Sequence, residues 1–366
     1  MKKTHDPKLA RRPPARTFER VLKWVGSITA ILSLFFGIYQ LATLVSDARA
    51  RARHIEELYV TAKAQQAAGD FTAAWESFGE AGKSAEEGGM IAKMAGELDA
   101  AQAKLRGAQE DLAIEWLQNI HAGSDEKFSA TVDKLLPSLV RGATAATGPR
   151  KADLLAHVGW AYFLKSRDGM SEADPVRSYA EAIAIDAANP YAHVYWGHWI
   201  LWTHGSLSDA MKQFAAALAS QREPGLVRKM ELAALANRNY DDAAQIEYLR
   251  AVNEMRKAHE PIGDRAAGEV YSIYYSSVGN SNAFDKLIGA VPPSEQIELI
   301  RVILGDAWLD PSKIPTRQAA LATLQEAAGE RTAALATWKE LRALLPANQG
   351  STLEPLAAAA IKRLSR

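Results

Sequence analysis

The spacing of apolar residues predicts a chain built from α-helices. Over most of its length, apolar side chains recur three or four positions apart, as in GMIAKMAGELDAAQAKLRGAQEDLAIEWLQNI. This is the interval at which side chains share one face of a helix. Segments of alternating Val, Ile and Thr bounded by turn pairs, which mark strands, hardly occur. We therefore expect an all-α fold.

One stretch near the N-terminus is apolar on every face. Residues 24–45, WVGSITAILSLFFGIYQLATLV, contain no charged side chain. About 20 such residues span the hydrocarbon core of a bilayer, and Trp24 lies where interfacial aromatic residues occur. We predict that 24–45 is a single uncleaved transmembrane helix. A signal peptide cleaved near Ala48 or Ala50 is the alternative, although its apolar core would span only about 7–15 residues.

The charges that flank this stretch predict its orientation. Residues 1–23 form a basic tail with eight Lys or Arg side chains, whereas Arg49, Arg51, Arg53 and Lys63 follow the stretch. Because the more basic flank stays in the cytoplasm, we expect a cytoplasmic N-terminus and a domain of residues 46–366 on the other side. The high Ala and Arg content then favours a bacterial inner membrane with a periplasmic C-terminal domain.

Beyond the apolar stretch, the chain shows internal repetition. In AAGDFTAAWESFGEA, Gly69 precedes Ala74 by five residues and Phe78 by nine. In AAGERTAALATWKELRALLP, which begins just before Gly329, an alanine and an aromatic residue recur at the same two intervals. A fixed spacing of this kind predicts two helices joined by a glycine turn, repeated along the chain.

These residues resemble the tetratricopeptide repeat (TPR) family, because its W…LG…Y…G.Y..A…F..A…P pattern recurs here with substitutions. The resemblance implies a TPR-like α-α superhelix in which small residues let paired helices approach closely. It also implies a concave groove, lined by the first helix of each pair, that binds a protein or peptide. The clearest copies are residues 55–85, 154–187, 189–220 and 317–348. A weaker copy is found at residues 228–256.

Composition narrows the functions that the chain can have. It has 43 basic and 43 acidic side chains, so the net charge is zero. A nucleic-acid-binding protein usually has a basic surplus, and we predict no nucleic-acid partner. The chain has no cysteine, which excludes disulfides, thiolate zinc sites and a cysteine nucleophile.

Two segments resemble sites of chemistry without meeting their requirements. Residues 77–85, SFGEAGKSA, end like a phosphate loop, but Ser77 replaces its first glycine and the expected preceding element is a helix instead of a strand. Four histidines, at 157, 193, 198 and 204, lack the helical spacing of three or four residues that a metal pair needs. We therefore predict no catalytic residue, no cofactor and no metal site.

An aromatic stripe is the strongest candidate for binding. In YAHVYWGHWILWTHG, the residues Tyr195, Trp199 and Trp202 lie on one helical face, with His198 close by. Tyr and Trp dominate binding hot spots, and the resemblance places this helix on the groove. We predict that these four residues contact a partner. The alternative is that they pack against neighbouring helices, because large aromatic side chains are mostly buried.

These observations favour a membrane-anchored scaffold that binds a protein or peptide through a helical-repeat groove. One alternative is an enzyme whose unrecognised site lies within residues 262–316. Another is a passive oligomerisation element that forms homo-oligomers through its repeats or through the anchor. The anchor contains Ser33 and Gly37, a pair of small residues at the spacing that lets two membrane helices pack.

Overall fold

Helices make up the regular structure of the chain. The computed structural model describes residues 15–86, 97–120, 122, 124–170, 174–238, 240–278, 280–304, 312, 314–345 and 352–366. Within these residues sixteen α-helices and no strand are present, which confirms the predicted all-α class. The helices are α1 (Ala15–Ala67), α2 (Phe71–Glu86), α4 (Glu97–Asn119), α5 (Ser129–Ala145), α6 (Gly148–Arg167), α7 (Pro175–Ile185), α8 (Pro190–Trp202), α9 (Leu207–Ala219), α10 (Pro224–Ala236), α11 (Asp242–Lys257), α12 (Asp264–Ser277), α13 (Ser281–Ala290), α14 (Pro293–Leu304), α15 (Ile314–Ala327), α16 (Arg331–Leu344) and α17 (Leu353–Leu364).

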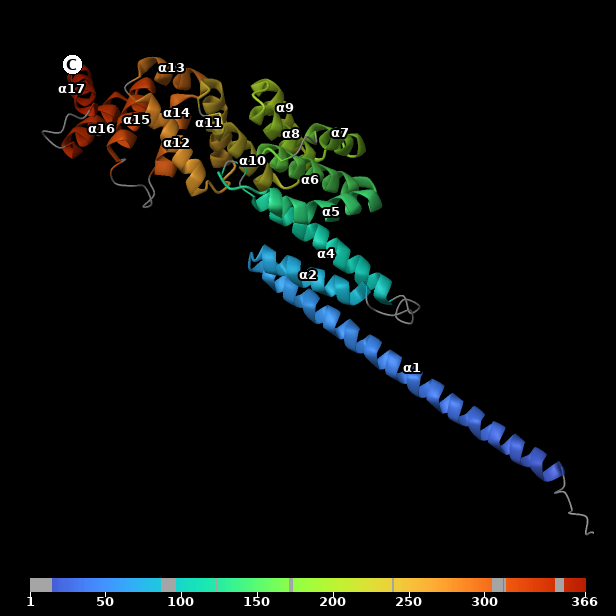
Figure 1. Ribbon diagram of the computed structural model, residues 1–366. Coiled ribbons are helices and arrows are strands. Elements are labelled where there is room, and N and C mark those ends of the chain that lie inside the picture. The colour runs from blue at the N-terminus through green and yellow to red at the C-terminus, as the bar shows by residue number, and fades with distance from the viewer. Residues whose placement is uncertain are drawn as a thin grey trace, which may run out of the picture. The chain divides into compact units, whose positions relative to one another are not determined.

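Contacts divide the chain into two compact units, residues 1–113 and residues 114–366. In the first unit, α1 continues without a break from the apolar stretch into the segment that packs on α2 (Figure 1). Residues 31–47 of this helix are exposed. In the part of the chain that the structure describes, α1 is the one helix long and apolar enough to cross a membrane, a test that a signal sequence also passes.

The C-terminal part of α1 and all of α2 form an antiparallel hairpin (Figure 1). Ile55 and Ala62 of α1 are buried, as are Ala74 and Phe78 of α2. These residues recur every turn or every second turn, so each helix presents one apolar face to the other. The ring of Tyr59 meets that of Phe78 edge-on at 5.8 Å between centroids, which makes the aromatic residue of the first predicted repeat part of the hairpin core.

In the second unit, helices pack mainly against their neighbours in sequence. The pairs α6–α7, α8–α9, α10–α11 and α15–α16 each pack together, and they fall on residues 154–187, 189–220, 228–256 and 317–348, where the sequence predicted repeats. Further contacts join α6 to α8 and α8 to α10. Each new pair therefore covers an apolar face that the previous pair leaves open, which is how stacked helix pairs build a continuous core.

Two glycines let paired helices come into close contact. A Cβ atom on Gly159 of α6 would lie 2.4 Å from the Tyr179 ring of α7. One on Gly197 of α8 would lie 2.6 Å from the Phe214 ring of α9. Both rings are fully buried. The missing side chain thus makes the room into which the partner helix places its aromatic ring.

A single turn geometry ends the first helix of four pairs. In the Schellman motif, one residue adopts a left-handed conformation, and the last turn of the helix accepts two backbone hydrogen bonds from that residue and its successor. Gly69, Gly169 and Gly329 occupy this position with φ between 73° and 78°, and His204 occupies it with φ of 58°. In the pair at 189–220 the left-handed residue is thus a histidine, whereas glycine takes this position in the other three turns.

Candidate binding site

Helix α8, which carries the predicted stripe, is fixed by a buried cap. Asn189 precedes the helix, and its Oδ1 accepts a hydrogen bond from the Ala192 backbone N–H at 2.9 Å. Its Nδ2 donates to the Asp153 carboxylate of α6 at 2.6 Å. Side-chain caps of this kind satisfy the N–H groups at the start of a helix. Because the same side chain contacts α6, the cap also sets the register of α8 on that helix.

Two of the four predicted site residues lie in the interior. Tyr195 is fully buried, and its ring stacks on Trp160 of α6 with centroids 4.8 Å apart. His198 is also buried and meets the rings of Trp160 and Phe163 edge-on, at 5.2 and 5.3 Å. Tyr195 thus serves the packing of α8 on α6, which is the alternative that the sequence left open.

The other two predicted residues are half-buried at the edge of the same cluster. The rings of Trp199 and Trp202 meet Phe163 edge-on, with centroids 5.9 and 5.5 Å apart. Part of each indole is accessible to solvent. All four predicted residues therefore pack against Trp160 or Phe163. Contact with a partner stays a prediction, and Trp199 and Trp202 are the two residues accessible enough to make it.

A polar network lies beneath the aromatic cluster. The Nδ1 atom of His157 is 2.7 Å from the Asp153 backbone carbonyl, and its Nε2 is 3.0 Å from the Gln118 amide nitrogen. The Tyr195 hydroxyl is 3.2 Å from the same Nε2. Burial lowers the pKa of His157 to about 4, and the backbone hydrogen bond only partly opposes this effect. The ring is therefore neutral, with Nδ1–H donating and Nε2 accepting.

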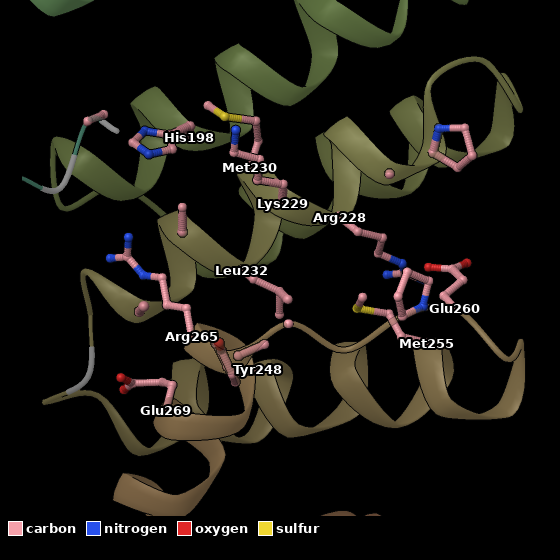
Figure 2. Close-up of a pocket in the computed structure, with 18 of the residues that line it drawn as sticks. His198, Arg228, Lys229, Met230, Leu232, Tyr248, Met255, Glu260, Arg265 and Glu269 are labelled. Carbon is pink, nitrogen blue, oxygen red and sulfur yellow. The ribbon is translucent and has the colours of Figure 1, made fainter. Parts of the chain in front are cut away.

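A cavity of about 770 Å³ opens beside this cluster (Figure 2). Its walls come from α10, from α11, from the segment that leads into α12, from the first turns of α12, and from Asn119, Ile120 and Ala122. His198 also lines it, so one predicted site residue connects the aromatic cluster with the cavity. Its volume lies within the range of about 300–1,000 Å³ that is typical of ligand pockets.

The middle of the cavity is apolar. Met230 and Leu232 of α10 line it together with Tyr248 and Met255 of α11, and Leu232 points toward Tyr248 (Figure 2). Burial raises the pKa of the Tyr248 hydroxyl, and the negative charge of Glu269 adds to this effect. The hydroxyl therefore stays protonated. An apolar lining with a few polar groups is the usual composition of a site that binds another molecule.

Charged groups lie at the two ends of the cavity (Figure 2). At one end, Arg228 donates to the buried Glu231 carboxylate at 2.8 Å, with Glu260 nearby on the wall. Burial raises the pKa of Glu231, Arg228 opposes this, and the negative charges of Glu247 and Glu260 add to it. At this end of the cavity, Arg228 is therefore surrounded by more than one carboxylate.

At the other end, Arg265 and Glu269 lie one helical turn apart on α12. Burial raises the pKa of Glu269, and the positive charge of Arg265 partly opposes this rise. Lys229 lies on the wall as well, where its Nζ donates to the Gln118 carbonyl at 3.1 Å. Burial lowers the pKa of this lysine. Lys229 thus has a hydrogen-bond partner within the protein, and Arg265 has the charge of Glu269 one turn away.

A buried ion pair positions residue 122, which forms part of the wall. Arg167 donates to the carbonyl oxygens of Ala122 and Ser124 at 2.7 and 3.1 Å. Its neighbour Asp168 accepts hydrogen bonds from the Phe128 and Ser129 backbone N–H groups at 2.6 and 2.9 Å. Burial favours a higher pKa for Asp168, but hydrogen bonds from Arg167, Ser129 and these N–H groups lower it overall.

The segments that resembled chemical sites have structural positions. Residues 77–85 lie inside α2, where no loop turns backbone N–H groups toward a phosphate. His193 hydrogen-bonds to the Gln213 side chain and the Ala187 carbonyl. Across the described ranges, no group of three or more His, Asp or Glu side chains is arranged to hold a metal ion.

Sequence reasoning missed the cavity except for His198. Most of the other residues that line it belong to the weak copy at 228–256 and to the beginning of the unassigned range 262–316. The signals present were Pro224 at the start of α10 and the segment with Pro261 and Gly263 before α12. These mark turns, but they do not show that the helices on either side leave a space.

Comparison with known proteins assigns no family to this fold. No protein-family model matches the chain, and no curated protein matches it.

Proposed function

We propose that the chain is a membrane-anchored scaffold whose TPR-like helix pairs bind a segment of another protein. The pairs follow one another in sequence and in space, and glycine contacts at Gly159 and Gly197 hold two of them closely together. Such stacks present extended surfaces to partners. The half-buried indoles of Trp199 and Trp202 and the adjacent cavity supply accessible aromatic and apolar surface on one such stack.

The observation that carries this proposal is the continuity of α1. Its exposed apolar part and the part that packs on α2 are one helix of 53 residues, about 80 Å long at 1.5 Å per residue. With the apolar part in a bilayer, no flexible linker would separate the membrane from the first helix pair. The basic tail of residues 1–23 supports a cytoplasmic N-terminus and a periplasmic domain at a bacterial inner membrane.

In-cell crosslinking followed by affinity isolation of the tagged full-length chain tests the proposal. The parent is compared with the double variant Trp199→Ala/Trp202→Ala and with Tyr275→Ala, a control that removes a 59% exposed aromatic side chain from α12. We expect one partner protein with the parent and the control, and its loss with the double variant, whose helicity should remain intact by circular dichroism.

The other outcomes are equally informative. Recovery of the same partner with all three chains would support the scaffold but place its binding surface away from the two tryptophans. Isolation of the chain alone, or only of further copies of itself, would overturn the proposal. That result would favour self-assembly or an enzyme as the function.

A further inference from the structure

The cavity between α10, α11 and α12 has an uneven distribution of charge. At its Glu260 end, Arg228 is paired with the carboxylate of Glu231, which does not itself line the cavity. Glu247 lies near enough to add negative potential there, but it has its own ion pair with Arg250 at 2.6 Å. Two carboxylates line the cavity, and neither has an ion pair among the described residues, but Glu269 has the positive charge of Arg265 one turn away on its own helix, whereas Glu260 lies beside an arginine that is already paired with Glu231. A positive charge placed beside Glu260 would therefore be stabilised.

The other two cations on the walls, Lys229 and Arg265, do not compensate Glu260. Lys229 is held by the Gln118 carbonyl, and Arg265 lies next to Glu269 at the opposite end (Figure 2). Between the two ends, the side chains of Met230, Leu232 and Met255 form an apolar surface. Methionine side chains adapt their shape to different apolar groups, which suits them to binding surfaces.

We propose that this cavity is the docking site for a partner peptide that inserts a large apolar side chain and places a lysine or arginine beside Glu260. This inference rests on the proposed scaffold function and adds the chemical class of the partner. The apolar side chain occupies the middle of the cavity, where its burial drives association. The basic group pairs with Glu260 and selects the orientation of the peptide, because charges at an interface contribute mainly specificity.

The size and the chemistry of the cavity favour a peptide over a purely apolar ligand. Both ends carry charged groups, and a hydrocarbon chain that filled the cavity would leave Glu260 without a partner and remove water from it. Placing a carboxylate in apolar surroundings without a partner is costly. A peptide supplies apolar and basic groups on neighbouring residues, so it matches both parts of the site.

Fluorescence anisotropy with the full-length protein in detergent micelles tests this inference. The probe is a short fluorescein-labelled peptide of Gly and Ser that contains a central Leu-Phe pair and a lysine two residues further on. One control peptide carries Glu in place of the lysine, and the other carries Ser-Ser in place of Leu-Phe. We expect the first control to bind about tenfold more weakly and the second to show no saturable binding.

Variants of the protein assign the binding to the cavity. Ala233→Trp fills the apolar middle, and Ala215→Trp places the same residue at an exposed position of α9 as its control. Glu260→Gln removes the charge but keeps the size of the side chain, with Glu340→Gln on the exposed face of α16 as its control. We expect Ala233→Trp to abolish binding and Glu260→Gln to weaken it about tenfold.

Glu260→Gln should also bind the lysine and glutamate peptides equally, because the group that distinguishes them is gone. The inference is overturned if Glu260→Gln still prefers the lysine peptide, or if Ala233→Trp binds the probe like the parent. Equal displacement of the probe by dodecanoate and by an unlabelled peptide of either charge would also overturn it, since the cavity would then select for apolar character alone. Glu260→Gln keeps the test valid if Ala233→Trp fails to fold.

This test and the one for the scaffold fail separately. If crosslinking recovers a partner both with the parent and with a folded Ala233→Trp variant, the scaffold function stands and the cavity is not its docking site. If crosslinking recovers no partner, the scaffold proposal fails whatever the peptide titration shows.

Discussion

At the residue scale, the most informative side chain is His157. It lies fully buried between Asp153, Gln118 and Tyr195 and is neutral, because burial lowers its pKa to about 4. In the unfolded chain a histidine titrates near pH 6.5. A depressed pKa in the folded state contributes stability above pH 6.5 and loses it as the pH falls toward 4, because only the unfolded state then binds the proton.

We therefore predict that the free energy of unfolding falls between pH 6.5 and pH 4, and that His157 accounts for about 3 kcal/mol of the fall at about 1.4 kcal/mol per pKa unit. The variant His157→Gln, which keeps a donor and an acceptor, should show a flatter profile. Urea unfolding followed by tryptophan fluorescence at several pH values measures both. Identical pH profiles for the parent and the variant would contradict this role of His157.

The substitution of glycine by alanine should have opposite effects on stability at two helical positions, Gly268 and Gly159. In a helix, Gly→Ala stabilises by about 1 kcal/mol where there is room. At Gly268 of α12 a Cβ atom would meet nothing within 4 Å, whereas at Gly159 it would lie 2.4 Å from the Tyr179 ring. Overpacking of this kind costs about 1–3 kcal/mol.

Gly268→Ala should therefore raise the stability by up to about 1 kcal/mol, and Gly159→Ala should lower it by about 1–2 kcal/mol net of the gain in helix propensity. Thermal unfolding monitored by circular dichroism compares the two variants with the parent. A stabilising Gly159→Ala would mean that α6 and α7 are not in the close contact described above.

At the scale of elements, the same turn recurs with different residues in its left-handed position. Besides the four turns within pairs, α11 ends in this geometry at His259, with φ of 58°. The left-handed conformation costs an L-amino acid about 1–2 kcal/mol, and it costs glycine nothing comparable. His259 is exposed. Removing its side chain therefore costs little stability.

We expect His259→Gly to stabilise the chain by about 0.5–1 kcal/mol after the greater backbone entropy of glycine in the unfolded state is taken into account. The reverse change, Gly169→Ala, should destabilise it by about 1 kcal/mol, because φ there is 73° although no neighbour lies within 4 Å. Chemical denaturation of both variants measures these changes. A loss of stability in His259→Gly together with a gain in Gly169→Ala would show that backbone strain does not control the stability of this turn.

At the scale of the whole molecule, α1 carries exposed apolar side chains along residues 31–45. Three of its aromatic side chains, Phe35, Phe36 and Tyr39, are 63–67% exposed. An apolar surface of this size in water is unfavourable by roughly 25 cal/mol per Å². The hairpin with α2 covers only the C-terminal part of the helix.

The full-length chain should therefore fractionate with membranes and resist extraction by high salt, whereas a variant that lacks residues 1–45 should be found in the aqueous fraction. Mass spectrometry of the membrane-bound protein should give the mass of the uncleaved chain. A mature protein that begins near residue 51 would identify the apolar stretch as a cleaved signal peptide. Release of the full-length chain by salt alone would rule out an integral anchor.

The sequence contained enough information for the class of fold, because helix formation follows from local periodicity. The repeated spacing after Gly69 and Gly329 predicted a second helix at each place, and the structure contains these helices as α2 and α16. Both glycines form the same turn, with φ of 78°. In the aromatic stripe, periodicity placed Tyr195, Trp199 and Trp202 on one face of α8. It could not show which of them the neighbouring α6 would cover.

The amino-acid sequence by itself thus determined that the described chain is helical, that helices follow one another in packed pairs, and that one long helix is apolar enough to enter a membrane. Only the tertiary structure decided that Tyr195 and His157 are interior, that His204 takes a left-handed position that glycine takes in other turns, and that a cavity lies beside Glu260. The physical reason is distance along the chain. Helix formation depends on residues within one or two turns. Burial and empty space depend on residues far apart in the sequence, since Asn119, Ile120 and Ala122 line one cavity together with helices that begin more than a hundred residues further on.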